Sequence, residues 1–201
     1  DFDFDRASRT LREVCTCPGD PMKTITDLRD QLEVGSIDGE AFADAAIERI
    51  GFPGDREEFV LIYQDIFTPN QKIWNLIDRL SGNYPLYLLS NTSDLHHAGL
   101  LRDYPVFSVF QGGVFSYAAK ATKPGSQIFQ AALRELPINA STTLYLDDLS
   151  DNVAEGRRQG FSSFCYNSNN HSSCLSYLAE RKINFNEGRS DPWLHPRLGM
   201  E

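Results

Sequence analysis

The stretch of sequence that most limits the possible folds is the segment Thr143–Asn152, TLYLDDLSDN. In it, the short apolar run Leu144–Leu146 leads directly into two adjacent carboxylates, Asp147 and Asp148. Uninterrupted apolar runs of this length are typical of buried strands in a parallel sheet. Ligands in such sheets bind just past the carboxyl ends of the strands. The sequence therefore predicts an α/β fold with the two acids at the ligand-binding edge of its sheet.

The two adjacent acids have two possible explanations. Neighbouring carboxylates repel each other unless a cation or a proton compensates their charge. Ligation by oxygen atoms favours magnesium over zinc or copper, which makes Asp147 and Asp148 candidate Mg²⁺ ligands. The same string also fits an acidic helix N-terminus, because Asp and Ser commonly cap helices. Taken alone, the segment leaves both explanations open.

Two further segments add to this pattern. The strand-like run Pro85–Leu89 ends in Ser90 and Asn91, whose hydroxyl and amide groups can bind phosphate oxygens together with a following helix N-terminus. Lys123 precedes Pro124, a residue type that often begins a helix. Each segment is weak by itself, because a capped helix or a solvated lysine has the same sequence. Their order along the chain, strand-Ser, then Lys-Pro, then strand-Asp-Asp-x-x-x-Asn, is much more specific.

This order resembles the haloacid dehalogenase-like (HAD) hydrolase superfamily, whose second, third and fourth motifs are a Ser or Thr after a strand, a Lys, and an acidic pair. The resemblance covers nearly the whole chain and is strongest to the helical-cap subgroup, in particular to bacterial glucose-1-phosphate-type sugar phosphatases. It implies a Rossmann-like parallel sheet flanked by helices, with an all-helical cap inserted. It also implies magnesium-dependent hydrolysis of a small phosphate monoester, such as a sugar phosphate, through an aspartyl-phosphate.

The resemblance also assigns roles to individual residues. Ser90 and Lys123 would hold the transferring phosphoryl group, with Asn91 beside Ser90 as a further substrate-binding residue. Asp148 would ligate Mg²⁺, and Asp147 would support the metal or be linked to it through water. Asn152 would orient the site. Ser90, Lys123 and Asp148 are thus the predicted catalytic residues.

The nucleophile of the family does not have a clear counterpart. In the relatives it is the first Asp of a motif that ends an apolar first strand, whereas no apolar run precedes the alternating Asp-Phe pattern of Asp1, Asp3 and Asp5. We therefore expect the segment Asp1–Arg6 to follow that motif, with the first strand and its nucleophile lying upstream of the sequence given. Because that strand is in the middle of the family's sheet, leaving it out would expose two unpaired strand edges.

Three alternatives remain at this point. One of Asp1, Asp3 and Asp5 could be the nucleophile. The chain could be a non-catalytic binding module with the same fold. It could also be a metal-free 2-haloacid dehalogenase, but a metal-free site has no evident use for the adjacent acids Asp147 and Asp148.

Helical periodicity divides the chain into domains. The predicted helices are Ala7–Val14, Ile25–Leu32, Glu40–Ile50, Glu57–Phe67 and Gln71–Leu80. The first four predict a helical cap over residues 7–68, with residues 1–6 and 69–190 forming the α/β core. The polar stretch 191–201 is broken by Pro and predicts an irregular or disordered tail.

Charge and composition limit the possible partners. The formal net charge of −9 over 201 residues, without a Lys or Arg cluster, argues against nucleic acid and anionic membranes and leaves a small phosphorylated metabolite as the expected partner. No apolar run is long enough to span a membrane, so cytoplasmic location is the default expectation. His96 and His97 lack further ligands at metal spacing and are expected to be ordinary helix residues. The cysteines, which also lack zinc spacing and predict reduced thiols, are Cys15, Cys17, Cys165 and Cys174.

Overall fold

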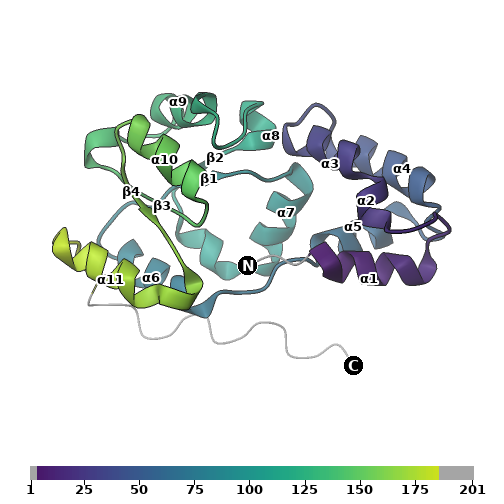
Figure 1. The fold of residues 1–201 in the computed structure, drawn as a ribbon, viewed down its shortest axis with the longest axis horizontal. Coiled ribbons are helices and arrows are strands. Elements are labelled where there is room, and N and C mark those ends of the chain that lie inside the picture. Colours follow the sequence, from purple (N-terminus) through teal and green to yellow (C-terminus); the bar gives the residue numbers. More distant parts are fainter. Residues whose placement is uncertain (1–3, 186–201) are drawn as a thin grey trace. The chain divides into compact units, whose positions relative to one another are not determined.

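The computed structural model describes residues 4–185, which form two compact units. The first, which we call the helical unit, comprises residues 4–69, 91–99 and 115–122. The second, the sheet unit, comprises residues 70–90, 100–114 and 123–185. Asp1, Asp3 and the predicted tail 191–201 lie outside the described residues. The predicted α/β class with a helical part is confirmed (Figure 1).

The helical unit contains five helices from the first third of the chain and two segments from later on. Its elements are α1 (Phe4–Val14), α2 (Pro21–Thr24), α3 (Thr26–Glu33), α4 (Gly39–Ile50), α5 (Arg56–Gln64), the first part of α7 (Asp94–Asp103) and α8 (Ser116–Ala119). Side chains that cap the helices fix where they begin. Asp38 accepts the Ala41 N–H at the start of α4, and Asp55 forms a reciprocal capping box with Glu58 at the start of α5.

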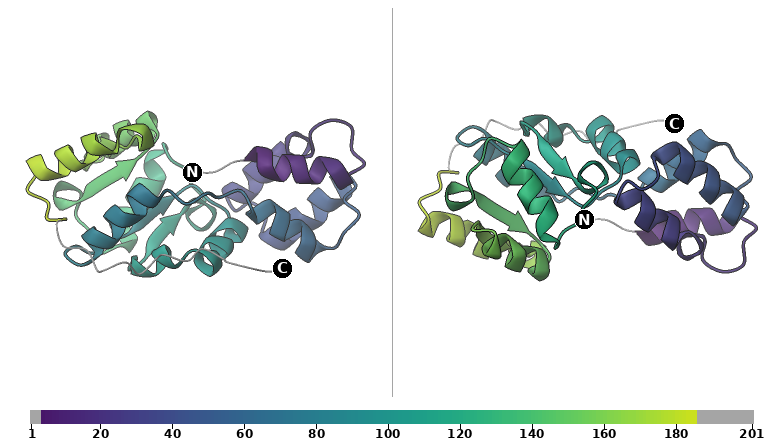
Figure 2. Two further views of the ribbon diagram at one scale, coloured as in Figure 1. Left: turned by 90° about the horizontal axis from the view of Figure 1, so that it is seen from below. Right: turned by 90° about the horizontal axis from the view of Figure 1, so that it is seen from above.

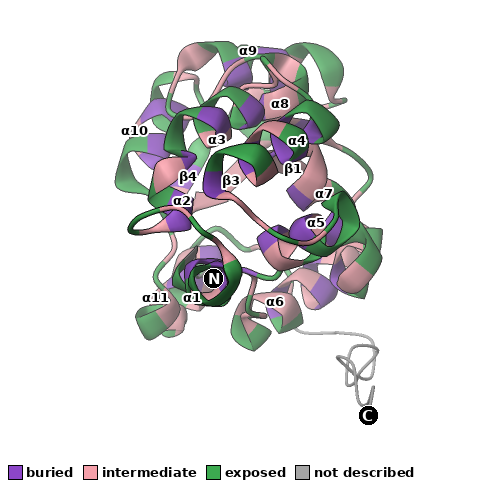
Figure 3. Ribbon diagram, turned by 90° about the vertical axis from the view of Figure 1, so that its right-hand side faces the viewer, coloured by how far each residue is buried: buried purple, intermediate pink, exposed green. Residues whose placement is uncertain are grey.

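Helices α1 to α5 surround a single apolar core. Phe42 of α4 is completely buried and packs against two aromatic rings of α5, with centroid distances of 6.0 Å to Phe59 and 4.7 Å to Tyr63. Leu11 of α1 and Ile25 between α2 and α3 complete the same core. Figure 3 shows buried positions on one side of these helices and exposed positions on the other, the amphipathic pattern that the sequence predicts.

The sheet unit alternates helices and short strands. Its elements are α6 (Gln71–Ser81), β1 (Leu88–Ser90), η1 (Pro105–Val109), β2 (Gly113–Phe115, whose last residue clusters with the helical unit), α9 (Ser126–Glu135), η2 (Ala140–Thr142), β3 (Leu144–Asp147), α10 (Ser150–Arg158), β4 (Ser162–Cys165), η3 (Ser168–Asn170) and α11 (His171–Glu180). The strands lie between two helical layers (Figure 2).

Alternate residues of β3 face these two layers, as the pleat of a strand requires. Leu144 and Leu146 pack against the apolar cluster of α6 and α11. Tyr145 points the other way, where its ring is 5.4 Å from that of Phe129 on α9 and lies directly over Gly156 on α10. Each unit therefore has its own core.

The strands of the described residues form two separate two-stranded sheets, β1–β2 and β3–β4. Strand β3 is parallel to β4, with Leu144 opposite Ser162 and Asp147 opposite Cys165, which confirms the predicted parallel pairing. The sequence predicts buried strands, but every residue of β1 and β3 is only half-buried. The reason is that each of these strands is paired along one edge within the described residues.

Two segments that the sequence places in the α/β core, 91–99 and 115–122, cluster instead with the helices. Polar contacts to α4 and to the end of α3 explain this. Asp94 Oδ2 accepts the N–H of Gly39 at 2.8 Å, and the buried Ser116 Oγ donates to the carbonyl of Glu33 at 2.8 Å. The helical unit is therefore larger than the cap predicted for residues 7–68.

Two helix boundaries also differ from the sequence-based prediction. The short helix α2 was not expected, and it forms because Asp20 caps it by accepting two backbone N–H groups. Helix α5 ends at Gln64 rather than Phe67, since Asp65 leaves the helical conformation and closes the last turn through its own N–H. No helix within residues 4–185 is long and apolar enough to cross a membrane.

Candidate active site

The predicted acidic pair lies where β3 ends and the chain turns into α10. Asp147 is the last residue of β3, and Asp148 begins the turn to α10. The two acids have different surroundings, because Asp147 is still part of the strand and Asp148 is in the bend that follows it. The side chain of Asp147 is 5% exposed, whereas Asp148 is an exposed residue.

Four donors surround the carboxylate of Asp147. Its Oδ2 accepts hydrogen bonds from the Lys123 ammonium (2.7 Å) and the Tyr145 hydroxyl (2.6 Å). Its Oδ1 accepts hydrogen bonds from the Leu149 N–H and the Asn152 side-chain amide, both at 2.9 Å. Asn152 is itself buried, in the first turn of α10. The sequence-predicted residues Lys123, Asp147 and Asn152 therefore form one hydrogen-bonded cluster.

Lys123 connects this cluster to the β1–β2 sheet. Its side chain is 10% exposed, and its ammonium also donates to the carbonyl oxygen of Leu89 in β1 at 2.8 Å. Ser90, the next residue, is the half-buried last residue of β1. The ends of β1 and β3, which lie far apart in the sequence, are thus joined by a single ammonium group.

The charges in the cluster stabilise each other. Burial raises the pKa of Asp147, but the nearby Lys123 charge and the hydrogen bonds from Lys123, Tyr145 and Leu149 outweigh it, so the pKa lies below its ordinary value. Burial and the adjoining Asp147 carboxylate raise the pKa of Tyr145 far above its usual range. Asp147 is therefore a carboxylate near neutral pH, and Tyr145 keeps the proton that it donates.

The described residues offer only part of a magnesium site. No group of three or more His, Cys, Asp or Glu side chains that could hold a metal occurs among residues 4–185. The oxygens of Asp147 are occupied by four donors, which leaves Asp148 as the exposed member of the acidic pair. Mg²⁺ commonly keeps several waters and binds through one or two carboxylates together with substrate phosphate. The donor chemistry at Asp148 fits that pattern.

Not all predicted residues fall in the same unit. The boundary between the two units lies between Ser90 and Asn91, so Asn91 belongs to the helical unit.

Sequence reasoning also missed one member of the hydrogen-bonded cluster around Asp147. Tyr145 stands in the apolar run of β3, but it is two residues before Asp147 and therefore on the same side of the strand. That period of two is the signal that could have identified it.

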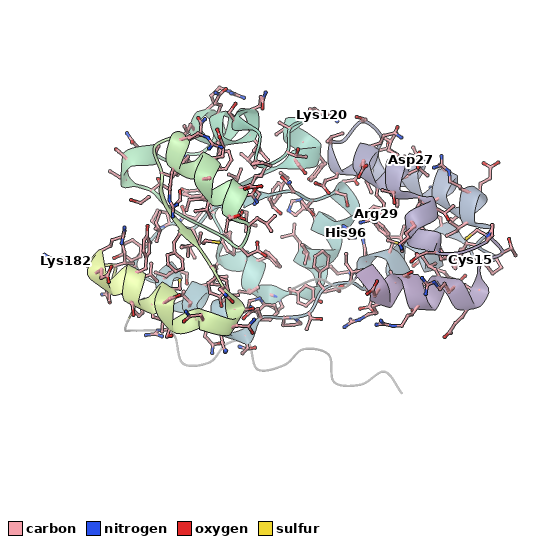
Figure 4. All side chains as sticks on the ribbon, in the orientation of Figure 1. Cys15, Asp27, Arg29, His96, Lys120 and Lys182 are labelled. Atoms are coloured by element: carbon pink, nitrogen blue, oxygen red, sulfur yellow. The ribbon has the colours of Figure 1, made fainter. Side chains whose placement is uncertain are left out.

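His96 is a residue of the helical core. Its Nε2 donates to the carbonyl oxygen of Tyr63 at 3.1 Å, and its ring stacks on that of Tyr63 with a centroid distance of 4.5 Å. Figure 4 labels this histidine. Burial lowers the pKa of His96 from 6.5 to about 4, so the ring is neutral. The expectation of an ordinary helix residue is confirmed, and the ring is more deeply buried than its polar character suggests.

Comparisons with known proteins agree with the fold. A curated D-ribitol-5-phosphate phosphatase of Bacteroides thetaiotaomicron is 26% identical over 148 residues, which cover 69% of this chain and 71% of the relative. A HAD family enzyme from the same organism, crystallised with magnesium and inorganic phosphate, is 23% identical and superposes with a TM-score of 0.71 over 84% of this chain and 88% of its own.

A predicted HAD-like family hydrolase from Porphyromonas gingivalis is 22% identical, with a TM-score of 0.72 over 89% of this chain and 91% of its own. No family model matches the chain. The order of the three motifs, the fold and the curated relative nevertheless agree with one another. The chain therefore has the fold of these haloacid dehalogenase-like enzymes and is similar in sequence to a curated phosphatase.

Proposed function

We propose that this chain is a magnesium-dependent phosphatase of small phosphate monoesters. The observation that carries the proposal is the position of the Lys123 ammonium, which links the end of β1, beside Ser90, to Asp147 at the end of β3. A fixed positive charge at the carboxyl ends of the strands is suited to bind a phosphoryl group. The curated relative is a D-ribitol-5-phosphate phosphatase, which supports sugar or polyol phosphates as the substrate class.

In this proposal the residues of the chain bind and orient the phosphoryl group. Lys123 neutralises its charge, Ser90 donates a hydrogen bond to one of its oxygens, and Asn91 assists as a neighbouring donor. Asn152 fixes the Asp147 carboxylate, which in turn fixes Lys123. The proposed role of Asp147 is therefore to hold Lys123 in position.

Asp148 would hold the magnesium ion together with water and the substrate phosphate. When bound there, the ion neutralises the charge that develops on the phosphoryl oxygens. The exposure of Asp148 supports this role, because an ion in solution has to reach its ligand.

The attacking carboxylate is proposed to belong to a strand upstream of Asp1 that lies between β1 and β3. It would take the phosphoryl group from the substrate, releasing the alcohol, and water would then hydrolyse the aspartyl-phosphate to free phosphate. Two observations support the upstream strand. The described strands form two separate sheets, and β1 and β3 are half-buried although their sequences are apolar. Asp5 is a poor candidate for the nucleophile because it is exposed in the first turn of α1.

The test measures phosphate release from an aryl phosphate and from a panel of pentitol, pentose and hexose phosphates, with and without Mg²⁺. It uses the 201-residue chain and the same chain preceded by its upstream coding residues. We expect turnover that requires the upstream residues and Mg²⁺. Lys123→Ala and Asp148→Asn should each lower kcat/KM by about 100-fold or more.

The matched control is Asp151→Asn, which removes another exposed carboxylate, on the first turn of α10, and should leave turnover unchanged. Turnover by the 201-residue chain alone would contradict the upstream nucleophile. No turnover by the longer chain would contradict the phosphatase and favour a binding module. Chloride release from 2-chloropropionate without metal would identify a dehalogenase instead.

A further inference from the structure

The Asp147 carboxylate has one neighbour that none of the predicted roles accounts for, the side chain of Tyr145. Its hydroxyl donates to the same Oδ2 atom that accepts the Lys123 ammonium, at 2.6 Å and 2.7 Å respectively. The ammonium also lies 5.9 Å from the centroid of the Tyr145 ring. Tyr145 thus contacts both members of the ion pair.

The ring of Tyr145 is held in place independently of its hydroxyl. It packs at centroid distances of 5.4 Å and 6.2 Å from Phe129 and Phe161, and Gly156 of α10 leaves the space that it occupies. A tyrosine is not needed for this packing, because a phenylalanine ring fills the same volume. The packing therefore does not account for the hydroxyl, which donates to the Asp147 carboxylate at 2.6 Å.

The chemistry of the pair explains why a fixed carboxylate matters. A lysine ammonium is a point charge on a flexible four-carbon chain, so its own side chain does not fix its position. The place of the Lys123 charge is therefore set by the groups that it contacts, which include the Leu89 carbonyl and Asp147 Oδ2. Leu149 and Asn152 fix Oδ1 of the carboxylate, and the Tyr145 hydroxyl fixes Oδ2.

We propose that Tyr145 is a positioning residue, whose hydroxyl holds the Lys123 ammonium, through Asp147, at the place from which it binds phosphate. The inference rests on the proposed phosphate-binding role of Lys123. The Tyr145 hydroxyl acts through the Asp147 carboxylate, so the effect of removing the hydroxyl disappears when that carboxylate is neutralised.

The test is Tyr145→Phe, alone and combined with Asp147→Asn, in the full chain. The first measurement is the ¹H–¹⁵N NMR signal of the Lys123 ammonium, which is visible only while hydrogen bonds protect it from exchange. The second is the dissociation constant for inorganic phosphate with Mg²⁺, by calorimetry. We expect Tyr145→Phe to broaden the ammonium signal and to weaken phosphate binding about tenfold, as the loss of a hydrogen bond to a charged group does. In the Asp147→Asn background the same change should have less than about a twofold effect.

Tyr87→Phe is the matched control, because it removes a tyrosine hydroxyl that donates to an exposed acceptor, Gln111, in the same unit. It should change neither readout. An unchanged ammonium signal and affinity in a folded Tyr145→Phe chain would overturn the proposal, as would an equal loss in the Asp147→Asn background. If the chain preceded by its upstream coding residues binds no phosphate, the proposed function fails, and the ammonium signal alone then decides the role of Tyr145.

Discussion

Asp147 and Asp148 are adjacent residues of the same type, but they differ in burial and therefore in their interactions. Asp147 neutralises the buried Lys123 ammonium, whereas Asp148 is exposed to solvent. We expect Asp147→Asn to lower the free energy of unfolding by about 3 kcal/mol, because it removes the negative charge that Asp147 places beside a buried ammonium. Urea unfolding at pH 7 measures this loss.

The natural control is Asp148→Asn, which makes the same chemical change one residue further on. At an exposed position we expect an effect within about 0.5 kcal/mol. Equal effects of the two substitutions would show that the Asp147–Lys123 pair does not contribute to stability. The adjacency of the two acids is evident from the sequence, but which of them is buried depends on the face of β3.

His96 predicts how the stability of the chain depends on pH. The folded state holds the ring neutral with a pKa of about 4, against 6.5 when unfolded. Between these values the unfolded chain binds more protons, so stability is lost as the pH falls from about 6.5 towards 4. We expect the change from pH 7 to pH 5 to cost about 2 kcal/mol through this residue.

Urea unfolding of the parent chain and of His96→Gln, each at both pH values, isolates the contribution of His96. A glutamine can still donate to the Tyr63 carbonyl but does not titrate. The substitution should therefore lower stability at pH 7 and remove about 2 kcal/mol of the difference between the two pH values. The same pH dependence in both chains would contradict a buried neutral histidine.

At the scale of elements, local pattern predicted β3, its parallel pairing and most helices of the first eighty residues. These features follow from apolar periodicity and capping residues that are close together in the sequence. The role of Tyr145 was missed because an aromatic residue between two leucines has the pattern of a core strand. The role of its hydroxyl can be recognised only in the folded chain, where Lys123 lies next to Asp147 although the two are far apart in the sequence.

The contact of α10 with β3 depends on the absence of a side chain at Gly156. A Cβ atom there would lie 2.7 Å from both the Tyr145 ring and the Ser163 hydroxyl. In an open helix, Gly→Ala stabilises by up to about 1 kcal/mol. At Gly156 we expect the opposite sign, with a loss of about 1 to 3 kcal/mol from overpacking.

Gly82→Ala is the control, since this residue at the end of α6 has right-handed helical backbone angles and open space around its Cα. It should leave stability unchanged or raise it slightly. Thermal unfolding of both variants gives the comparison. A Gly156→Ala chain as stable as Gly82→Ala would contradict the tight packing of α10 on β3.

At the scale of the whole molecule, the sequence predicted a helical part and an α/β part, but not every segment of each. Residues 91–99 and 115–122 join the helical unit through bonds such as Asp94 to Gly39 and Ser116 to Glu33. These partners are 55 and 83 residues apart, and no local pattern encodes such pairings. The candidate site residues were easier to pick out from the sequence, because each of their motifs is a short contiguous string.

The two cores predict two regions of distinct local stability. Phe42→Ala opens a cavity in the helical unit, and Leu178→Ala opens one among α6 and α11. Each should cost about 2 to 5 kcal/mol. In native-state hydrogen exchange we expect each substitution to speed exchange mainly in its own unit. Equal acceleration across both units would show that residues 4–185 unfold as one cooperative block.

The helical unit is assembled from three stretches of chain, and this limits how it can be recombined. Besides the bonds from Asp94 and Ser116, the Gln64 amide donates to the carbonyl of Leu95 at 2.7 Å, and Lys120 donates to that of Gly35. A chimera that transplants only residues 4–69 into a relative would carry these groups without their partners. Transfer of an intact helical unit between relatives would therefore require grafting all three stretches together.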